Sequence, residues 1–329
     1  MTSPTGGRPR PVGSPRNREI SRGVPVLLVL RAIGLGDFLT AVPALRALAD
    51  AFPGHRRVLA APAWLEPLAR HTGAVDEVLP AEPLGPVAWR RPEVAVNLHG
   101  RGPQSHRRLL ETRPRRLIAF AHPDVPESAG FPVWRADEHE VRRWCRLLSE
   151  SGVPADPTRL RLSRAGLPPA DEAARGATLV HPGAQSPARR WPAQRWAAVA
   201  RTELARGRRV MVTAGPGESE LARRVVQVAG LPPGCLREGM DLLQLAGLVA
   251  AAGRVACGDT GVAHLATALH TWSVLLFGPT PPAHWGPPPG RSHLVLWKGR
   301  VSDPLADRPA PGLLEIRPRE VTAALGSLG

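Results

Sequence analysis

The chain has 329 residues, 43% of them hydrophobic, and a formal net charge of +15 at pH 7. This length predicts about two domains. An aromatic content of only 4%, with no tyrosine and no recognised nucleic-acid motif, argues against nucleic acid as a partner. The positive charge instead favours anionic ligands such as nucleotides, or peripheral contact with an anionic membrane surface.

Cysteine usage and hydropathy indicate where the protein works. Cys145, Cys235 and Cys257 have no metal-ligand spacing and suggest no disulfide framework, which favours a reducing compartment. No apolar run is long enough to span a bilayer, and the first residues lack a signal-peptide core. The sequence therefore predicts a cytoplasmic protein, with peripheral contact at the inner face of the membrane left open.

The first half of the chain alternates between strand and helix patterns. Residues 1–24 are rich in Pro, Gly, Ser and Arg, which predicts a disordered basic tail. Short apolar runs then predict strands at 25–30, 58–61, 77–79, 94–98 and 117–120. Helical periods predict helices at 38–51, 64–71, 104–111 and 137–151. Such alternation is typical of a parallel sheet covered on both faces.

A Pro- and Arg-rich stretch, 153–175, interrupts this pattern and is the best candidate for a linker. Strands are then predicted at 177–181, 209–213, 254–257 and 273–277, and helices at 192–206, 218–229, 241–252, 262–269 and 319–328. The sequence thus predicts an α/β protein of two doubly wound, Rossmann-like domains, 25–165 and 176–329, with a cleft between them. Ligands should lie outside the carboxyl ends of the strands.

One such end is the turn Gly258-Asp259-Thr260-Gly261, between a strand and a helix. The unpaired N–H groups and the positive dipole end of that helix form an anion site. Asp259 and Thr260 stand at capping positions, and His264, four residues after Thr260, lies on the same helix face. A purely structural role as cap residues is the alternative.

Four segments in order carry a family resemblance: GDFLTAVPALRAL (36–48), HPGAQSPARRWPAQRW (181–196), AGPGESELA (214–222), and GDTGVAHLATAL (258–269) followed by LFGPT (276–280). Together they resemble glycosyltransferase family 9, the ADP-heptose:lipopolysaccharide heptosyltransferases. The resemblance implies a GT-B fold, with the acceptor on the N-terminal domain and the nucleotide sugar on the C-terminal domain. It also implies inverting transfer of a heptose-like sugar to a hydroxyl of a saccharide or glycolipid acceptor.

In the family pattern the Asp of the GD motif, here Asp37, is the proposed general base. A carboxylate there can take the proton from the attacking acceptor hydroxyl. Gly34 and Gly36 would let the backbone approach the sugar closely. The alternative for Asp37 is an N-cap of the helix that follows, and one residue could serve both roles.

The resemblance also implies a set of donor-binding residues. Arg189 stands where the family has a lysine that meets the diphosphate, and Arg190 follows it; Lys298 is the only lysine of this chain. Thr260 and Gly261 would hold the diphosphate, with His264 near it, and Asp259 would orient the turn or touch the donor sugar. The alternative for Arg189 is a side chain lying along Trp191.

Two further residues would contact the nucleoside. Glu218 matches the acidic position that suits hydrogen bonding to ribose hydroxyls, although a carboxylate at a helix start needs no ligand. Met240 could contact the base, and core filling is the alternative.

The sequence predicts neither a metal nor a cofactor. It contains no DxD motif and no cluster of metal ligands, and nothing else converges on Asp303 and Asp307. A run of five arginines on the acceptor side is either a binding surface for a phosphorylated acceptor or a solvated face: Arg107, Arg108, Arg113, Arg115 and Arg116.

Three alternative functions remain at this point. One is transfer of another nucleotide sugar to a secondary metabolite or cell-surface glycan. Another is an NAD-dependent dehydrogenase, although no predicted strand is followed by GxGxxG. The last is a non-catalytic module that binds glycan or nucleic acid.

Overall fold

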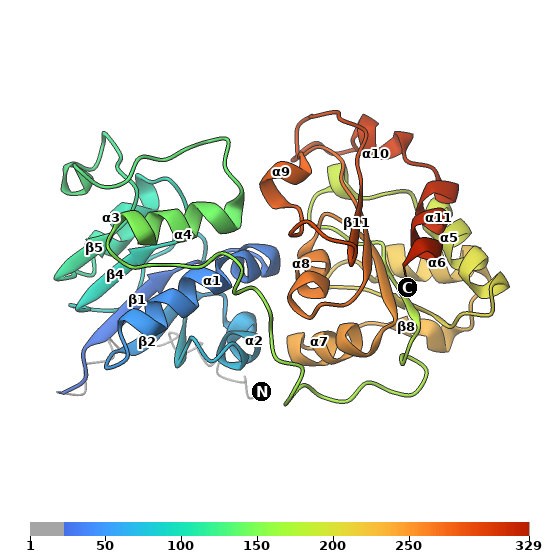
Figure 1. Cartoon of the computed structure of the whole chain (residues 1–329), viewed down its shortest axis with the longest axis horizontal. Coiled ribbons are helices and arrows are strands. Elements are labelled where there is room, and N and C mark those ends of the chain that lie inside the picture. Colours follow the sequence, from blue (N-terminus) through green and yellow to red (C-terminus); the bar gives the residue numbers. More distant parts are fainter. Residues whose placement is uncertain (1–22, 329) are drawn as a thin grey trace, which may run out of the picture.

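The computed structural model describes residues 23–328, which form two parallel β-sheets flanked by helices (Figure 1). The predicted architecture of two doubly wound sheets is confirmed. The predicted tail, residues 1–24, falls almost wholly outside the described residues, and the domain boundaries stay predictions. Within residues 23–328, every helix is too short or too polar to cross a bilayer.

The first sheet has five parallel strands in the order β3-β2-β1-β4-β5. They are β1 (Val26–Leu30), β2 (Arg56–Ala61), β3 (Glu77–Pro80), β4 (Val94–Asn97) and β5 (Arg116–Ile118). The helices of this half are α1 (Leu35–Ala51), α2 (Glu66–His71), α3 (Gln104–Leu110) and α4 (Glu140–Glu150). Because successive side chains of a strand point to opposite faces, Leu27 packs with α1 and α4, whereas Leu28 packs on the face covered by α3.

The second sheet has six parallel strands in the order β11-β10-β9-β6-β7-β8. They are β6 (Thr178–His181), β7 (Val210–Thr213), β8 (Leu236–Arg237), β9 (Arg254–Gly258), β10 (Ser273–Leu276) and β11 (His293–Leu296). The helices are α5 (Ala193–Ala205), α6 (Ser219–Ala229), α7 (Leu242–Ala251), α8 (Gly261–Ala268), α9 (Pro282–Trp285), α10 (Pro311–Glu315) and α11 (Pro318–Ser327). Residues of α5, α6 and α11 pack on one face of this sheet, and residues of α7 and α8 pack on the other.

Each sheet has a point where its strand order reverses. In the first sheet β1 lies beside β4, and in the second β6 lies beside β9. Ligand sites of open parallel sheets lie at such switch points, outside the carboxyl ends of the strands. The loops after β1 and β9 lead directly into α1 and α8, so the fold places the amino ends of these two helices at the two switch points.

The two halves are in contact where α1 meets α8, which we call the junction. A Cβ atom built on Gly36 would lie 2.8 Å from Cδ2 of His264, and one built on Gly261 would lie 2.8 Å from Cβ of Leu35. Helix α2 also contacts α7, and α4 contacts α9. One hydrophobic cluster contains residues of both sheets, from Leu27 in β1 to Val255 in β9. The two halves therefore share a continuous apolar core.

The structure differs from the sequence prediction at several element boundaries. Helix α1 begins at Leu35 and not at residue 38, because Gly34 takes an extended backbone and serves as the N-cap. Helix α4 begins at Glu140 and not at residue 137, because the His139 ring accepts a hydrogen bond from Val141 N–H and caps it. The strands β8 and β11 and the short helices α9 and α10 were not predicted.

We expect Leu265→Ala, at a fully buried position of α8 in this shared core, to lower the free energy of unfolding by about 2–5 kcal/mol, because it leaves a cavity. Chemical denaturation measures this loss. The matched control is Val301→Ala, whose side chain is 69% exposed and which should change stability by at most about 0.5 kcal/mol. Equal losses for both variants would contradict the shared core.

Candidate active site

Asp37 lies in the first turn of α1, beyond the carboxyl end of β1. The N-cap of α1 is Gly34, and Asp37 is the third helical residue, so the interpretation of Asp37 as the cap is wrong. The carboxylate lies close to the preceding loop, since a Cβ built on Gly34 would be 3.4 Å from Oδ2 of Asp37. The Asp37 side chain is 27% exposed, so it retains access from outside.

The environment of Asp37 raises its pKa. Burial is the largest cause and raises it; Arg31 lowers it, Glu140 raises it again, and backbone N–H groups lower it. A carboxylate with a raised pKa is a stronger base than an ordinary one. Neither Arg31 nor Glu140 was predicted as a site residue. Two features of the sequence could have indicated them: Arg31 directly follows the apolar strand VLLVL, and Glu140 stands at the start of an amphipathic helix.

On the other side of the junction from Asp37, in the second half of the chain, Arg189 lies beside Asp259. Arg189 ends a 3-10 turn, Pro187–Arg189, and its Nη1 lies 3.8 Å from Oδ2 of Asp259. Burial raises the pKa of Asp259 to about 6; Arg189 lowers it and Asp37 raises it. The first turns of α1 and α8 are in contact, and Asp37 is among the charges that raise the pKa of Asp259. The carboxylates of the two halves therefore lie near each other, with Arg189 beside Asp259.

Arg189 has unused hydrogen-bonding capacity. Its Nε is buried and has no hydrogen-bond partner in the described part of the chain, and its side chain is 28% exposed. The arginine that lies over Trp191 is Arg195, with its guanidinium carbon 5.8 Å from the ring centroid. A buried, unpartnered donor is costly unless it meets an acceptor, so Arg189 is suited to an anionic ligand.

The amino end of α8 completes this side of the junction. Thr260 is the N-cap, with an extended backbone, but its side chain makes no capping hydrogen bond. The hydroxyl and the first N–H groups of the helix are thus suited to bind an anion. Gly258 and Gly261 are both closely packed: a Cβ on Gly258 would lie 3.1 Å from the carbonyl oxygen of Arg189.

His264 lies behind this turn, against Gly36 of the opposite helix. Its ring packs edge-to-face on Trp285, with 6.0 Å between ring centroids. The pKa of His264 is lowered to about 4: burial is the largest cause, His139 and Arg189 act in the same direction, and Glu140 opposes them. His264 is therefore neutral near pH 7 and supplies no charge to an anion.

Glu218 forms a second polar group, at the carboxyl ends of β6 and β7. It is the N-cap of α6 but makes no side-chain capping bond. Its Oε2 accepts a hydrogen bond of 2.8 Å from Gly215 N–H and lies 3.5 Å from Nε2 of His181. The buried ring of His181 in turn shares a hydrogen bond of 3.0 Å with Thr213. His181 was not predicted as a site residue, although it begins one of the quoted motifs.

The contacts of the other predicted site residues do not by themselves place them at the junction. Arg190 donates from Nε to the carbonyl of Ala184, at 2.8 Å. Met240 is partly buried and packs on the shared core. In the basic run, Arg108 and Arg115 are paired with Glu111 and Glu93. Residues 23–328 contain no group of three or more His, Cys, Asp or Glu side chains suited to a metal ion.

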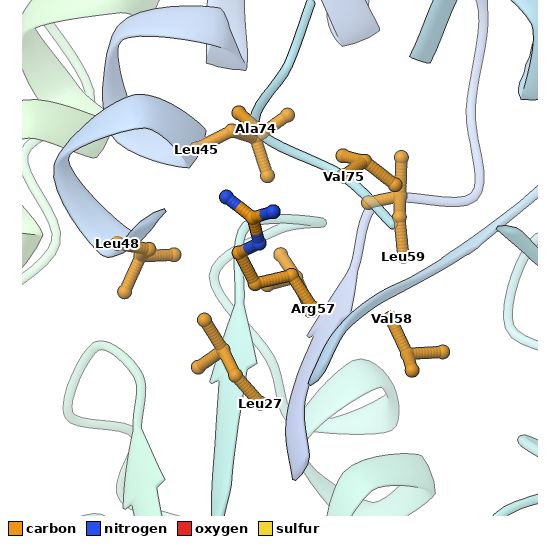
Figure 2. Close-up of a pocket in the computed structure, with 9 residues that line it drawn as sticks. Leu27, Leu45, Leu48, Arg57, Val58, Leu59, Ala74 and Val75 are labelled. Atoms are coloured by element: carbon orange, nitrogen blue, oxygen red, sulfur yellow. The ribbon is translucent and has the colours of Figure 1, made fainter. Parts of the chain in front are cut away.

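Two cavities are far smaller than the roughly 300–1,000 Å³ of a ligand pocket. Figure 2 shows the first, of about 10 Å³, enclosed by apolar side chains of the first half with Arg57 among them. The second, of about 20 Å³, lies at the junction and is lined by Thr40, His139 and His264 among others. The convergence of charged groups, and not cavity size, identifies the candidate site.

Comparisons with known proteins identify the family and the fold. A sequence model of glycosyltransferase family 9 (heptosyltransferase) matches residues 131–306, more than half of the chain. No curated protein sequence matches the chain.

Three solved structures resemble the fold. The Escherichia coli ADP-heptose lps heptosyltransferase II is 20% identical, with a TM-score of 0.72, over 92% of this chain and 98% of its own. A glycosyl transferase family 9 protein from Veillonella parvula is 19% identical, with a TM-score of 0.74, over 92% and 96%. The E. coli heptosyltransferase WaaC with ADP is 18% identical, with a TM-score of 0.68, over 91% and 98%. These likenesses confirm the predicted GT-B fold.

We expect His264 to titrate at about pH 4 and not near its ordinary value of 6.5. Between those values the unfolded chain binds a proton that the folded chain does not, so this residue makes stability fall as the pH drops from about 6.5 to 4. NMR titration of the ring measures the midpoint, with His264→Asn assigning the resonance. A midpoint near 6.5 would show that the ring is not enclosed by the junction.

Proposed function

The chain belongs to glycosyltransferase family 9, the heptosyltransferase family, and from this premise we propose that it transfers a heptose-like sugar from a nucleoside diphosphate to a hydroxyl of a saccharide or glycolipid acceptor. We propose ADP-heptose as the donor. The observation that carries the proposal is the contact between the first turn of α1, which carries Asp37, and the first turn of α8, beside which Asp259 lies 3.8 Å from Arg189.

In the proposed reaction Asp37 is the general base. The acceptor oxygen forms a bond to the anomeric carbon while the bond from that carbon to the diphosphate oxygen breaks. The hydroxyl proton goes to the Asp37 carboxylate, and the electron pair of the broken bond leaves with the nucleoside diphosphate. Because the base and the leaving group lie on opposite faces of the sugar, the configuration at that carbon inverts. The raised pKa of Asp37 supports this role.

Arg189 and the amino end of α8 would stabilise the leaving diphosphate. The unpartnered Nε of Arg189 supports this role, because a guanidinium can bind phosphate with two parallel hydrogen bonds. Thr260, whose hydroxyl makes no capping bond, and the N–H of Gly261 would add neutral donors. Because Arg189 and the amino end of α8 would already supply positive charge to the leaving diphosphate, we propose that no metal ion is required. Turnover should then persist in EDTA.

The nucleoside would lie toward β6 and β7. Glu218 is held at the ends of these strands by Gly215 N–H and stands beside His181, and a carboxylate in this position suits ribose hydroxyls. Asp259 would orient the α8 turn or contact the donor sugar. For Arg190 we retain the predicted place among the donor-binding residues, and for Met240 the predicted contact with the base.

The acceptor would approach from the first half of the chain, which carries Asp37. Peripheral contact with an anionic membrane is part of the proposal because the net charge is +15 and a glycolipid acceptor would be presented at a membrane surface. We propose a cytoplasmic location, in keeping with the cysteine usage.

Asp37→Asn should lower kcat by about 10²–10⁴-fold, because the amide cannot accept the proton, while ADP affinity stays near that of the wild type. The assay measures nucleotide release and the mass of the acceptor product with ADP-heptose, ADP-glucose, and UDP- and GDP-sugars. Binding of NADH in place of every nucleotide sugar would indicate a dehydrogenase. Full activity of Asp37→Asn would exclude Asp37 as the base.

Arg189→Ala should weaken ADP binding by about ten- to a hundredfold, because a charge-assisted hydrogen bond to phosphate is lost. Arg189→Lys, which restores the residue that the family resemblance implies, should lose less. Isothermal calorimetry measures both. The matched control is Arg201→Ala, an exposed arginine of α5 bonded to the Val228 carbonyl, which removes the same charge away from the junction. If both alanine variants weakened ADP binding equally, the cause would be the overall positive charge of the protein and not a contact between Arg189 and phosphate.

A further inference from the structure

Arg31 is a buried arginine that the proposed chemistry does not yet use. It follows β1 directly, and its side chain is 1% exposed. Its Nε donates to the backbone carbonyl of Asp37 at 2.9 Å, and its Nη1 donates to the carbonyl of Leu98 after β4. Its guanidinium carbon also lies 4.8 Å from the ring centroid of Trp144. One side chain thus ties together the end of β4, the first turn of α1 and α4.

The remaining nitrogen of Arg31 lies between two carboxylates. Nη2 is 3.0 Å from Oε1 of Glu140 and 3.6 Å from Oδ1 of Asp37. It also donates to Thr40 Oγ1, at 3.2 Å, and this hydroxyl donates to the Asp37 carbonyl at 2.8 Å. The Asp37 main chain is therefore held by direct bonds, while its carboxylate shares the arginine with Glu140.

Glu140 is the stronger competitor for Arg31. Besides Arg31, it accepts from Trp144 Nε1 at 2.8 Å and is paired with Arg143. Burial would raise the pKa of Glu140, but Arg31 and Arg143 together hold it below its usual range. Glu140 is therefore a buried negative charge at neutral pH, and its 3.0 Å contact takes up part of the charge that Arg31 could offer to Asp37.

We propose that Arg31 and Glu140 form a positioning pair for the Asp37 base: Arg31 fixes the first turn of α1 and holds the carboxylate in place, and Glu140 limits how strongly Arg31 binds it. This inference rests on the proposed function. A carboxylate bound fully by one arginine would be ionised but weakly basic. A carboxylate without the arginine would be protonated in its buried site. Sharing the arginine gives a base that is both fixed and reactive.

Other charged or titratable groups lie around Asp37 and its two partners, and in the described structure none of them is hydrogen-bonded to the Asp37 main chain. From the loop after β4, His99 accepts a hydrogen bond from Ala32 N–H, at 3.2 Å. Asp259 of the second half acts on Asp37 electrostatically, while the remaining groups lie around Glu140 and His264: His139 at the cap of α4, Arg143 of α4 and Arg189 of the second half.

The test uses the opposite signs of the two partners. Glu140→Gln is nearly isosteric and removes a negative neighbour, so the pKa of Asp37 should fall. Arg31→Met removes the positive neighbour, so the pKa of Asp37 should rise. Carbon-13 NMR of the Asp37 carboxyl, assigned with Asp37→Asn, measures both shifts without any need for turnover. Damage to the fold alone would not move the two variants in opposite directions.

The pH profile of kcat supplies the functional readout. Its acid limb should move to lower pH in Glu140→Gln and to higher pH in Arg31→Met. Below the limb, activity falls about tenfold for each pH unit by which the limb rises. ADP affinity should stay unchanged in both variants, since the donor binds in the other half. If Arg31→Met does not fold, Arg31→Lys takes its place. Arg31→Lys keeps the positive charge but has fewer hydrogen-bond donors. It should therefore lower kcat while moving the acid limb less than Arg31→Met would.

A buried carboxylate of the second half is the matched control. Glu203 is fully buried and paired with Arg206 and Arg208, far along α5 from the junction. Glu203→Gln should lower the melting temperature without moving the Asp37 titration. The proposal is overturned if Glu140→Gln leaves the Asp37 titration unmoved, or if both variants move it the same way. If the Asp37 titration is unmoved but Asp37→Asn is inactive, Asp37 remains the base and only the role of the Arg31–Glu140 pair is rejected. A fully active Asp37→Asn would reject the base itself.

Discussion

The structure depends on the close meeting of two helix amino ends. The first turns of α1 and α8 touch at Gly36 and Gly261. Glycine permits this contact, since a side chain at either position would collide with the opposite helix. Each helix end carries partial positive charge and unpaired N–H groups. Their meeting point is therefore suited to acidic side chains and to an anion. Asp37 lies in the first turn of α1 and Asp259 directly precedes the N-cap of α8, so this contact brings the two residues to the same place.

Each half contributes a carboxylate and an arginine to that point. Burial raises the pKa of both carboxylates, and in each half an arginine opposes this effect: Arg31 for Asp37 and Arg189 for Asp259. The two arginines differ in what else they bind. Arg31 has protein partners for each of its three nitrogens, whereas Arg189 retains a buried nitrogen without one. One arginine is therefore suited to a structural task and the other to a ligand.

Much of the fold could be predicted from the sequence, because strands buried on both faces read as short apolar runs and their helices keep a regular period. The predicted strands of both sheets are present with small changes at their ends. The predicted site residues Asp37, Arg189 and Asp259 do lie together, although their roles stay predictions.

Other features could not be predicted. Glycine at position 34 hid the true start of α1, since an extended N-cap without a side chain leaves no capping signal. The strand β11, residues 293–296, is only partly buried at the sheet edge and lies in a Pro- and Gly-rich region. Arg31 and Glu140 are 109 residues apart, so only the fold brings them together.

The apolar core that runs from β1 to β9 has a consequence for how this protein can vary. Two separate domains with a polar contact could be exchanged between relatives or expressed alone. Here, cutting the chain between the sheets would strip the inner faces of α1 and α8 of their covering and expose them to water. Each half therefore shields apolar surface of the other, and the contact between the two sheets' helices is part of the core of the protein.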